Sequence, residues 1–400
     1  MMQLGLKAAN RLLPLSALPT YQRVHRRFFH RRLSGLLGDL EKSTSQAVPL
    51  TIVFPPSIDW SKQLFQRPQQ MAAALAHQGV RVFYFQHREH WEAKAFQEIQ
   101  KGLFLCSAPV EVFWELPGES LYTYAMTWNC RSAIAPNVQG MIYDHVDDLS
   151  VFPGNQARLA SDHAAMIKQA RLVLASAERL LEQIKSVRQD VLLCPNGVDN
   201  EHFAQARSAH IQPPADLAEL LTDGKPLAGY IGALARWFDY PLLEAVSRER
   251  PDWHFVLIGP DHDQTLPEQL LALPNVHWLG QKPYQQLPAY LHFFSAALIP
   301  FRLNPITHAA SPIKLFEYMA AGKAVVSTPI HEATRLPGVL LACNAAEFAA
   351  QLDQARLLNT DTGYLAQSTE LARQNTWEIR ARQIIDALTS PSPSPGIIPL

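Results

Sequence analysis

Short apolar runs alternate with longer amphipathic stretches along the first half of the chain, the pattern of strands and helices in turn. Residues 68–78 and 156–170 have helical spacing, and Gly79 is a stop signal for the first of these helices. A strand, a loop, a helix and a second strand in this order form a βαβ unit with a parallel sheet. The runs that predict buried strands lie at 50–54, 80–85, 140–143, 172–176 and 191–193.

The same alternation begins again in the second half. Between the two series, residues 206–225 contain two adjacent prolines and few periodic apolar positions, which predicts a linker. We therefore expect two Rossmann-like, doubly wound α/β domains, an N-terminal one at 46–205 and a C-terminal one at 226–375. Strands of the second domain are predicted at 227–232, 254–259, 276–279, 296–300 and 324–327.

Both ends of the chain differ from these domains. Residues 1–45 form a basic extension, and within it residues 7–42 interleave arginines with leucine, phenylalanine and tyrosine. This pattern suits peripheral contact with an anionic bilayer surface, whereas the alternative interpretation is a solvated or loosely docked extension. We expect a C-terminal helix at 376–389 and a disordered, proline- and serine-rich tail at 390–400.

The composition excludes several classes of protein. The 400 residues are 48% hydrophobic and 18% charged, and a net charge of -1 provides no global attraction to nucleic acid. The four cysteines form no CxxC pair and the fifteen histidines no HExxH motif, so we predict no metal site. No apolar run reaches the ~18 residues of a spanning helix and no secretory signal is recognisable. We expect a cytoplasmic protein, at the inner face of the membrane if residues 7–42 bind there.

The loop and helix at 308–328 are the most specific feature of the second half. Ser311 has the chemistry of an N-cap, Pro312 suits the first helical position, and Gly322 suits the stop. The free backbone N–H groups that open this helix, among them that of Ile313, favour an anion such as a nucleotide diphosphate.

Two charged residues follow directly. Lys314 adds a positive charge in the first turn, and Glu317 is placed to accept hydrogen bonds from two hydroxyls of a ribose or sugar. The alternative is an ordinary surface ion pair between residues three positions apart.

A second loop follows the predicted strand at 227–232. Gly232 permits close approach of the backbone to a ligand, and Arg236 has the chemistry to clamp phosphate oxygens. The alternative is a tight turn from strand to helix with Arg236 in solvent.

Polar residues also follow strands of the first domain. Asp144, His145 and Asp147 lie after the run at 140–143, where a carboxylate or imidazole can take a proton from an acceptor hydroxyl or stabilise developing positive charge. The alternative role of the aspartates is to cap helices and form turns. Gln66 and Arg67 open the helix after the first strand and are candidates for contact with the acceptor.

Several motifs in the same order resemble the GT-B glycosyltransferases that assemble capsular, teichuronic and other cell-surface polysaccharides. The resemblance runs through WSKQLFQRPQQMAAALA, IYDHVDDLSVF, PNGVD, YIGALARWFDYPLLEAV, PDWHFVLIGP, LPNVHWLG and SPIKLFEYMAAGKAVVST, from about residue 50 to residue 388. It implies two Rossmann-like domains that face a central cleft, with Glu317 as a ligand for the donor nucleotide. It implies a nucleoside-diphosphate sugar as substrate, no bound cofactor, and a surface polysaccharide or lipid-linked glycan as acceptor.

The chain departs from this family pattern at two places. Retaining members commonly have two glutamates eight positions apart, and Ala309 stands at the first position. A Lys-Gly pair that contacts the diphosphate is replaced by Phe238 and Asp239. The resemblance therefore leaves retaining and inverting chemistry open. A catalytically silent scaffold of the same fold and a sugar-nucleotide epimerase are the competing hypotheses.

Overall fold

The computed structural model describes residues 13–14, 17–18, 20–22, 35–41, 50–60, 65–116, 120–152 and 154–390. The prediction for the basic segment lies largely outside these residues, and that for the tail lies outside them from residue 391 on. Two compact units are present. The first runs to Pro195 and includes the chain from Arg380 on, and the second is Asn196–Ile379.

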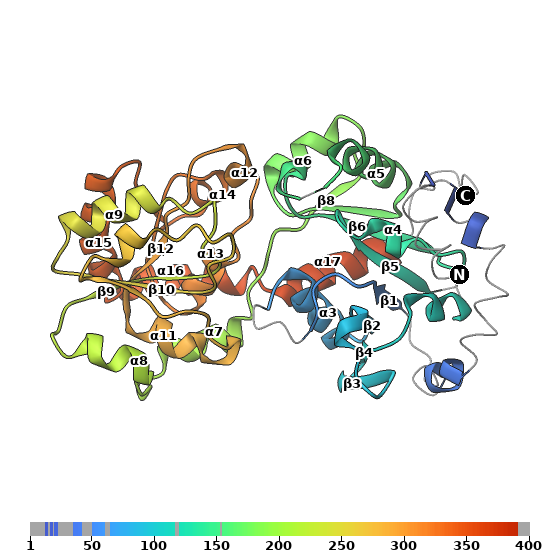
Figure 1. The fold of residues 1–400 in the computed structure, drawn as a ribbon, viewed down its shortest axis with the longest axis horizontal. Helices are drawn as coiled ribbons and strands as arrows, with labels where there is room; N and C mark the ends of the chain where they lie inside the picture. The colour runs from blue at the N-terminus through green and yellow to red at the C-terminus, as the bar shows by residue number, and fades with distance from the viewer. Residues whose placement is uncertain are drawn as a thin grey trace. The chain divides into compact units, whose positions relative to one another are not determined.

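The first unit is built on one eight-stranded sheet (Figure 1) in the order β3-β4-β2-β1-β5-β6-β7-β8. All neighbouring strands are parallel except β3 and β4. The strand order reverses between β1 and β5, so the loops after these two strands border the switch point of the sheet. The strands are β1 (Thr51–Phe54), β2 (Arg81–Phe85), β3 (Phe96–Gln100), β4 (Leu103–Cys106), β5 (Leu121–Met126), β6 (Gly140–His145), β7 (Leu172–Ala175) and β8 (Val191–Leu193).

Helices of the first unit pack on this sheet, with α3 against β2 and β4 and α6 against β7 and β8. The last helix begins in the second unit and ends in the first, because its residues from Arg380 on belong to the first unit. The α-helices of this unit beyond residue 50 are α3 (Arg67–His77), α4 (Cys130–Ala133), α5 (Gln156–Gln169), α6 (Glu178–Lys185) and the crossing helix α17 (Trp377–Thr389).

The second unit has a six-stranded, wholly parallel sheet in the order β11-β10-β9-β12-β13-β14. Numbered within the unit this order is 3-2-1-4-5-6, which is the doubly wound order of dinucleotide-binding folds, with its switch point between β9 and β12. The strands are β9 (Leu227–Ile231), β10 (His254–Ile258), β11 (Val276–Trp278), β12 (Phe294–Ile299), β13 (Val325–Ser327) and β14 (Leu340–Leu341).

Helices cover both faces of this second sheet (Figure 1). Helix α15 packs on β12 and β13 and against α9, whereas α11 packs on β9 and β12. The helices are α7 (Asn200–Ala204), α8 (Ala215–Ala218), α9 (Tyr240–Glu249), α10 (Glu268–Leu271), α11 (Leu287–Phe293), α12 (Pro305–His308), α13 (Lys314–Ala320), α14 (His331–Thr334), α15 (Ala345–Leu358) and α16 (Thr362–Arg373).

The predicted linker at 206–225 is wrong. Ala206 and Leu217 lie in the core of the second unit, with 2% and 0% of their surface exposed, so this stretch is part of that unit. The division lies between Pro195 and Asn196 instead. The region has sparse apolar periodicity because its helices are single short turns that bury at most one side chain each.

In the part of the chain that the structure describes, no helix combines the length and the apolar character needed to cross a bilayer.

Candidate functional site

The candidate donor site lies at the carboxyl edge of the second sheet, next to its switch point. Gly232 and Gly259 follow directly after β9 and β10, and their φ angles are +151° and +146°. A Cβ atom on Gly259 would lie 1.9 Å from the carbonyl oxygen of Gly232, so the two strand ends run unusually close together. Glycine is required here because L side chains rarely adopt this conformation and have no room.

Helix α13 lies beside this edge of the sheet, against the end of β9. It begins at Lys314 with Ile313 in the N-cap position, and the predicted N-cap role of Ser311 is wrong. The Ser311 hydroxyl instead accepts a hydrogen bond from the Asn196 N–H over 3.2 Å, while the Asn196 side chain donates to the Ser311 carbonyl over 2.6 Å. Pro312 supplies the carbonyl that accepts the Leu315 N–H at the first turn.

The end of α13 agrees with the prediction. Gly322 has a φ of +69° and its N–H donates to the Met319 carbonyl, while the Lys323 N–H donates to the Tyr318 carbonyl. These two bonds form a Schellman motif, which a glycine in the left-handed conformation completes. At the same time the Tyr318 hydroxyl accepts the Ile231 N–H over 2.8 Å, which fixes the helix against the end of β9.

Lys314 crosses directly over the end of β9. A Cβ atom on Gly232 would lie 2.1 Å from Cε and 2.5 Å from Nζ of this lysine, so the glycine makes room for its side chain. The ammonium group lies 5.3 Å from the ring centre of Tyr230 and 5.8 Å from that of Phe301, within the range of cation–π attraction. Burial lowers the pKa of Lys314, although the Glu317 carboxylate opposes this shift. Among the described residues Nζ has no hydrogen-bond acceptor.

Glu317 lies one turn further along α13, with only 7% of its surface exposed. Burial raises the pKa of its carboxyl to about 7, Lys314 opposes the shift, and the nearby Asp199 adds to it. Within the described parts of the chain this carboxylate forms no hydrogen bond and no ion pair, so the predicted alternative of a surface ion pair with Lys314 is wrong. A partly buried ammonium and a buried carboxylate, both lacking hydrogen-bond partners among the described residues, are costly for the fold and suit an anionic, hydroxyl-bearing ligand.

The raised pKa of Glu317 links stability to pH. Because the folded protein holds this proton more tightly than the unfolded chain, stability contributed by the protonated form is lost as pH rises from about 4.5 to about 7. The free energy of unfolding of the wild type, relative to that of Glu317→Gln, should therefore fall by about 3 kcal/mol over this range. Urea denaturation at pH 4.5 and 8 measures the difference, and an unchanged gap between the two proteins would contradict the burial of this carboxylate.

Arg236 lies away from this pair. Its side chain is 67% exposed, and both its N–H and its Nε donate to one oxygen of Asp263, over 3.0 and 3.2 Å. The residues that replace the family's Lys-Gly pair are structural, since Phe238 is fully buried and Asp239 caps α9 by accepting the Leu242 N–H. Arg236 therefore remains a candidate only for contact with an exposed part of a ligand.

The predicted residues of the first unit fall into two groups, of which the first is a buried network. Arg67, at the start of α3, donates Nε–H and Nη2–H to the two oxygens of Asp144 over 2.7 and 2.9 Å. Tyr124 donates to the same carboxylate over 2.6 Å, and Arg67 also donates to the Cys194 carbonyl over 2.9 Å. Burial alone would lower the pKa of Arg67, but Asp144 raises it well above its usual value. The Asp144 carboxylate therefore accepts hydrogen bonds from Arg67 and Tyr124, which are groups of the fold itself.

The second group, His145, Asp147 and Gln66, lies outside this network and differs in exposure. His145 is almost fully buried, and burial, together with His163, lowers the pKa of its imidazole to about 3, so it is neutral. Asp147 is half-buried, and burial raises its pKa to about 7, although Arg67 opposes this shift. Gln66 is exposed, and its backbone N–H donates to the Gln69 side chain at the start of α3.

The sequence analysis missed two residues of this same edge, Asp59 and His87. They follow β1 and β2, which are adjacent parallel strands, and they contact each other. The available signal was their position just after a predicted strand, the same signal that singled out Asp144. Among the described residues, no group of three histidine, cysteine, aspartate or glutamate side chains is arranged to hold a metal ion.

The fold agrees with comparisons to known structures. Sucrose-phosphate synthase from Thermosynechococcus elongatus has a TM-score of 0.62 and 17% identity, over 85% of this chain and 98% of that one. HepE of Anabaena in complex with UDP and glucose has a TM-score of 0.62 and 16% identity, over 86% of this chain and 100% of that one. The chain has the two-domain α/β fold of the GT-B glycosyltransferases, as the sequence predicted.

Sequence comparison is more specific. Residues 225–356, which lie in the second unit, match the family model described as glycosyl transferases group 1. A curated relative, the putative teichuronic acid biosynthesis glycosyltransferase TuaH of Bacillus subtilis strain 168, is 27% identical over 238 residues. This stretch covers 57% of the chain and 59% of the relative's length. The resemblance inferred from the motifs is confirmed.

Proposed function

We propose that the protein is a glycosyltransferase that moves a sugar from a nucleoside-diphosphate donor to a glycan acceptor. The observation that carries the proposal is the pair formed by Lys314, which lies beside Gly232 at the switch point, and the buried Glu317. Neither charged group has a hydrogen-bond partner in the described structure. Ligands of doubly wound sheets bind at this point. An anionic diphosphate complements the ammonium, and sugar or ribose hydroxyls complement the carboxylate.

The chemistry follows from these charges. When the bond between the sugar and the diphosphate breaks, negative charge develops on the leaving phosphate, and Lys314 is placed to stabilise it. The N–H groups of Ile313 and Lys314, for which the described structure shows no acceptor, add to this stabilisation. Glu317 holds the nucleotide or sugar through hydroxyls and so fixes the position of the reacting carbon.

The acceptor is proposed to bind the first unit, at the carboxyl edge of its sheet. Asp147 is the member of the predicted catalytic trio whose carboxylate is half-exposed, so it is the one suited to contact an acceptor hydroxyl. A surface polysaccharide or a lipid-linked glycan is the proposed acceptor, supported by the similarity to a putative teichuronic acid glycosyltransferase. Membrane contact through residues 7–42 stays a prediction.

The test is to incubate the full chain with a panel of nucleoside-diphosphate sugars and to separate the products by mass spectrometry. The proposal predicts release of the nucleoside diphosphate together with a glycoside when a glycan acceptor is added. A free isomerised sugar nucleotide would instead identify an epimerase. Tight binding of nucleotide without any turnover across donors and acceptors would identify a catalytically silent scaffold.

A further inference from the structure

A cavity lies in the second unit, at the edge of its sheet opposite to the donor site. Its volume is about 460 Å³, a size typical of pockets that hold small molecules. Of the residues that line it, His292 lies just before β12 and Lys323 just before β13. The cavity is therefore at the amino ends of these two parallel strands, whereas the donor site lies at the carboxyl edge of the sheet.

Five described segments line the cavity. They are the 3-10 turn Gln205–Arg207, the end of α11, the turn after α13, the residue that follows α15, and α16. The 3-10 turn packs against α11, and α13 packs against α16. All five segments belong to one compact unit, so the cavity is complete within it.

Lys323 provides one of two positive charges at the cavity. Its Nζ donates to the His292 carbonyl over 2.6 Å. An ammonium group has three N–H donors, so two of them have no acceptor among the described residues. Burial lowers the pKa of this ammonium to about 8, and no carboxylate of the described structure forms an ion pair with it. An anion in the cavity would supply both the acceptors and the countercharge.

Arg207 provides the second charge. Its side chain passes over Gly322, where an added Cβ atom would lie 3.3 Å from Cδ and 3.4 Å from Cγ of the arginine. The residue is exposed, and in the described structure its guanidinium forms no hydrogen bond and no ion pair. A guanidinium presents its N–H donors in a planar fork that fits two oxygens of a phosphate.

The rest of the polar lining is uncharged or basic. Nδ1 of His292 donates to the Ala206 carbonyl over 2.8 Å, which orients this ring. The Thr369 hydroxyl donates to the Leu365 carbonyl over 2.7 Å, so its oxygen can still accept a hydrogen bond from a ligand hydroxyl. None of the described residues that line the cavity is acidic. The lining therefore favours an anion.

The alternative role of the two cations is to neutralise the partial negative charge at the ends of helices. At the end of α13 this role is filled by the backbone, since the Tyr318 carbonyl accepts the Lys323 N–H within the Schellman motif. The carbonyl of His292, in the last turn of α11, takes one N–H of the Lys323 ammonium. Helix ends thus account for one donor of Lys323 and for none of Arg207 in the described structure.

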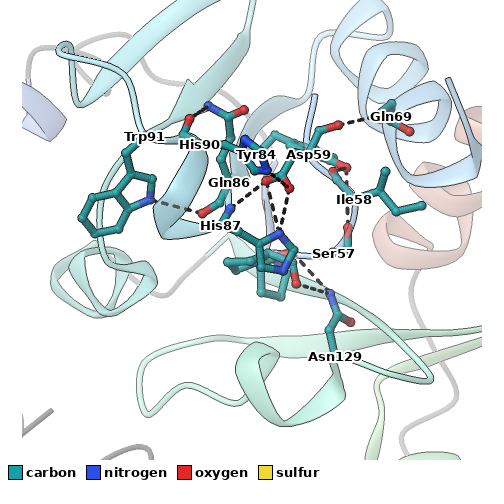
Figure 2. Close-up of polar contacts among 12 residues, drawn as sticks. Ser57, Ile58, Asp59, Gln69, Tyr84, Gln86, His87, His90, Trp91 and Asn129 are labelled. Atoms are coloured by element: carbon teal, nitrogen blue, oxygen red, sulfur yellow. Dashed lines mark hydrogen bonds and ion pairs between the residues drawn. The ribbon is translucent and has the colours of Figure 1, made fainter. Parts of the chain in front are cut away.

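Two other polar clusters show the usual arrangement, in which the side chains bond one another. Figure 2 shows the first, where the Asp59 carboxylate accepts the His87 N–H over 2.8 Å and lies 3.1 Å from Nδ1 of the same histidine. In the second, His254 lies 3.0 Å from an oxygen of Asp223 and 2.9 Å from a nitrogen of His277. The two cations of the cavity have no such partner beyond one carbonyl.

We propose that this cavity is a second binding site, separate from the donor site, for a small molecule that bears a phosphate group. Two positive charges suit the doubly charged phosphate, which accepts hydrogen bonds from Arg207 and Lys323. The remainder of the molecule fills the space beside α16, where a hydroxyl can donate to Thr369. The inference does not depend on the proposed function, because it uses no residue of the donor site.

The test is calorimetric titration of the full chain at pH 7 with inorganic phosphate and with glycerol 3-phosphate. Both should bind the wild type, and glycerol 3-phosphate should bind more tightly because its hydroxyls reach Thr369. Lys323→Met and Arg207→Met should each weaken binding by about 10-fold or more, since each removes charged hydrogen bonds. The matched control is Lys225→Met, which removes another lysine that lies shortly before a strand, and it should leave binding unchanged.

Two further measurements separate this cavity from the donor site. Lys314→Met removes the ammonium beside Gly232 and should leave the affinity for glycerol 3-phosphate unchanged. Saturating UDP should not displace glycerol 3-phosphate from the wild type. Loss of binding in Lys314→Met, or displacement by UDP, would assign the phosphate to the donor site and overturn the inference.

The remaining outcomes also decide the matter. Arg207→Met alters an exposed side chain, so its circular dichroism and thermal unfolding should match those of the wild type, and it gives the answer if Lys323→Met is unstable. Equal affinity of the wild type and Arg207→Met, or binding of neither probe, overturns the inference and leaves the proposed function standing. Binding of inorganic phosphate without glycerol 3-phosphate overturns it as well.

Discussion

Replacing Glu317 by alanine should weaken the binding of UDP by about 30- to 150-fold, which corresponds to about 2–3 kcal/mol. The reason is that a carboxylate buried without protein partners can form charge-assisted hydrogen bonds to ligand hydroxyls, and alanine forms none. Calorimetric titration at pH 8 is the measurement, because the raised pKa of about 7 leaves the carboxyl ionised there.

Two further variants make this experiment specific. Glu317→Gln keeps one acceptor oxygen but not the charge, so its affinity should fall between those of wild type and alanine. Glu268→Ala removes an exposed glutamate from α10 of the same unit and should leave the affinity unchanged. Equal affinity of wild type and Glu317→Ala would remove Glu317 from the donor site.

Replacing Arg67 by methionine should destabilise the first unit by about 3–5 kcal/mol. The change leaves the Asp144 carboxylate, which is fully buried, with a hydrogen bond from Tyr124 but without its countercharge. Denaturation by urea, followed by circular dichroism, measures the loss. The exposed pair of Arg248 and Glu244 supplies the control, since Arg248→Met should change stability by about 0.5 kcal/mol or less.

A double variant distinguishes the ion pair from simple loss of packing. Adding Asp144→Asn to Arg67→Met removes the unpaired charge, so the double variant should be more stable than the sum of the two single changes predicts. A cost below about 1 kcal/mol for Arg67→Met alone would contradict the structural role assigned to this pair.

Each strand that the sequence predicted from an apolar run is present. Strand β5 was missed although all six of its residues are buried, because it contains Tyr122, Thr123 and Tyr124. The Tyr124 hydroxyl donates to Asp144 inside the fold, and hydropathy does not detect such pairing. The short edge strand β14 has only two residues, too few for any periodicity.

The candidate site was also only partly predictable from the sequence. Spacing alone placed Lys314 and Glu317 one turn apart. It did not show whether the two side chains form an ion pair with each other or bind a ligand. The position of Asp144 after a strand suggested an exposed acid, whereas its partner Arg67 lies 77 residues away. For the same reason the pair of Asp59 and His87, 28 residues apart, was not recognised. Contacts between distant segments depend on the register of the strands, which a single sequence does not specify.

The most direct test of the account is a crystal structure of the full chain with bound UDP. The account predicts that the diphosphate contacts Nζ of Lys314 above Gly232 and that hydroxyls of the nucleotide donate to the Glu317 carboxylate. Nucleotide bound elsewhere, with Lys314 and Glu317 still lacking hydrogen-bond partners, would contradict it.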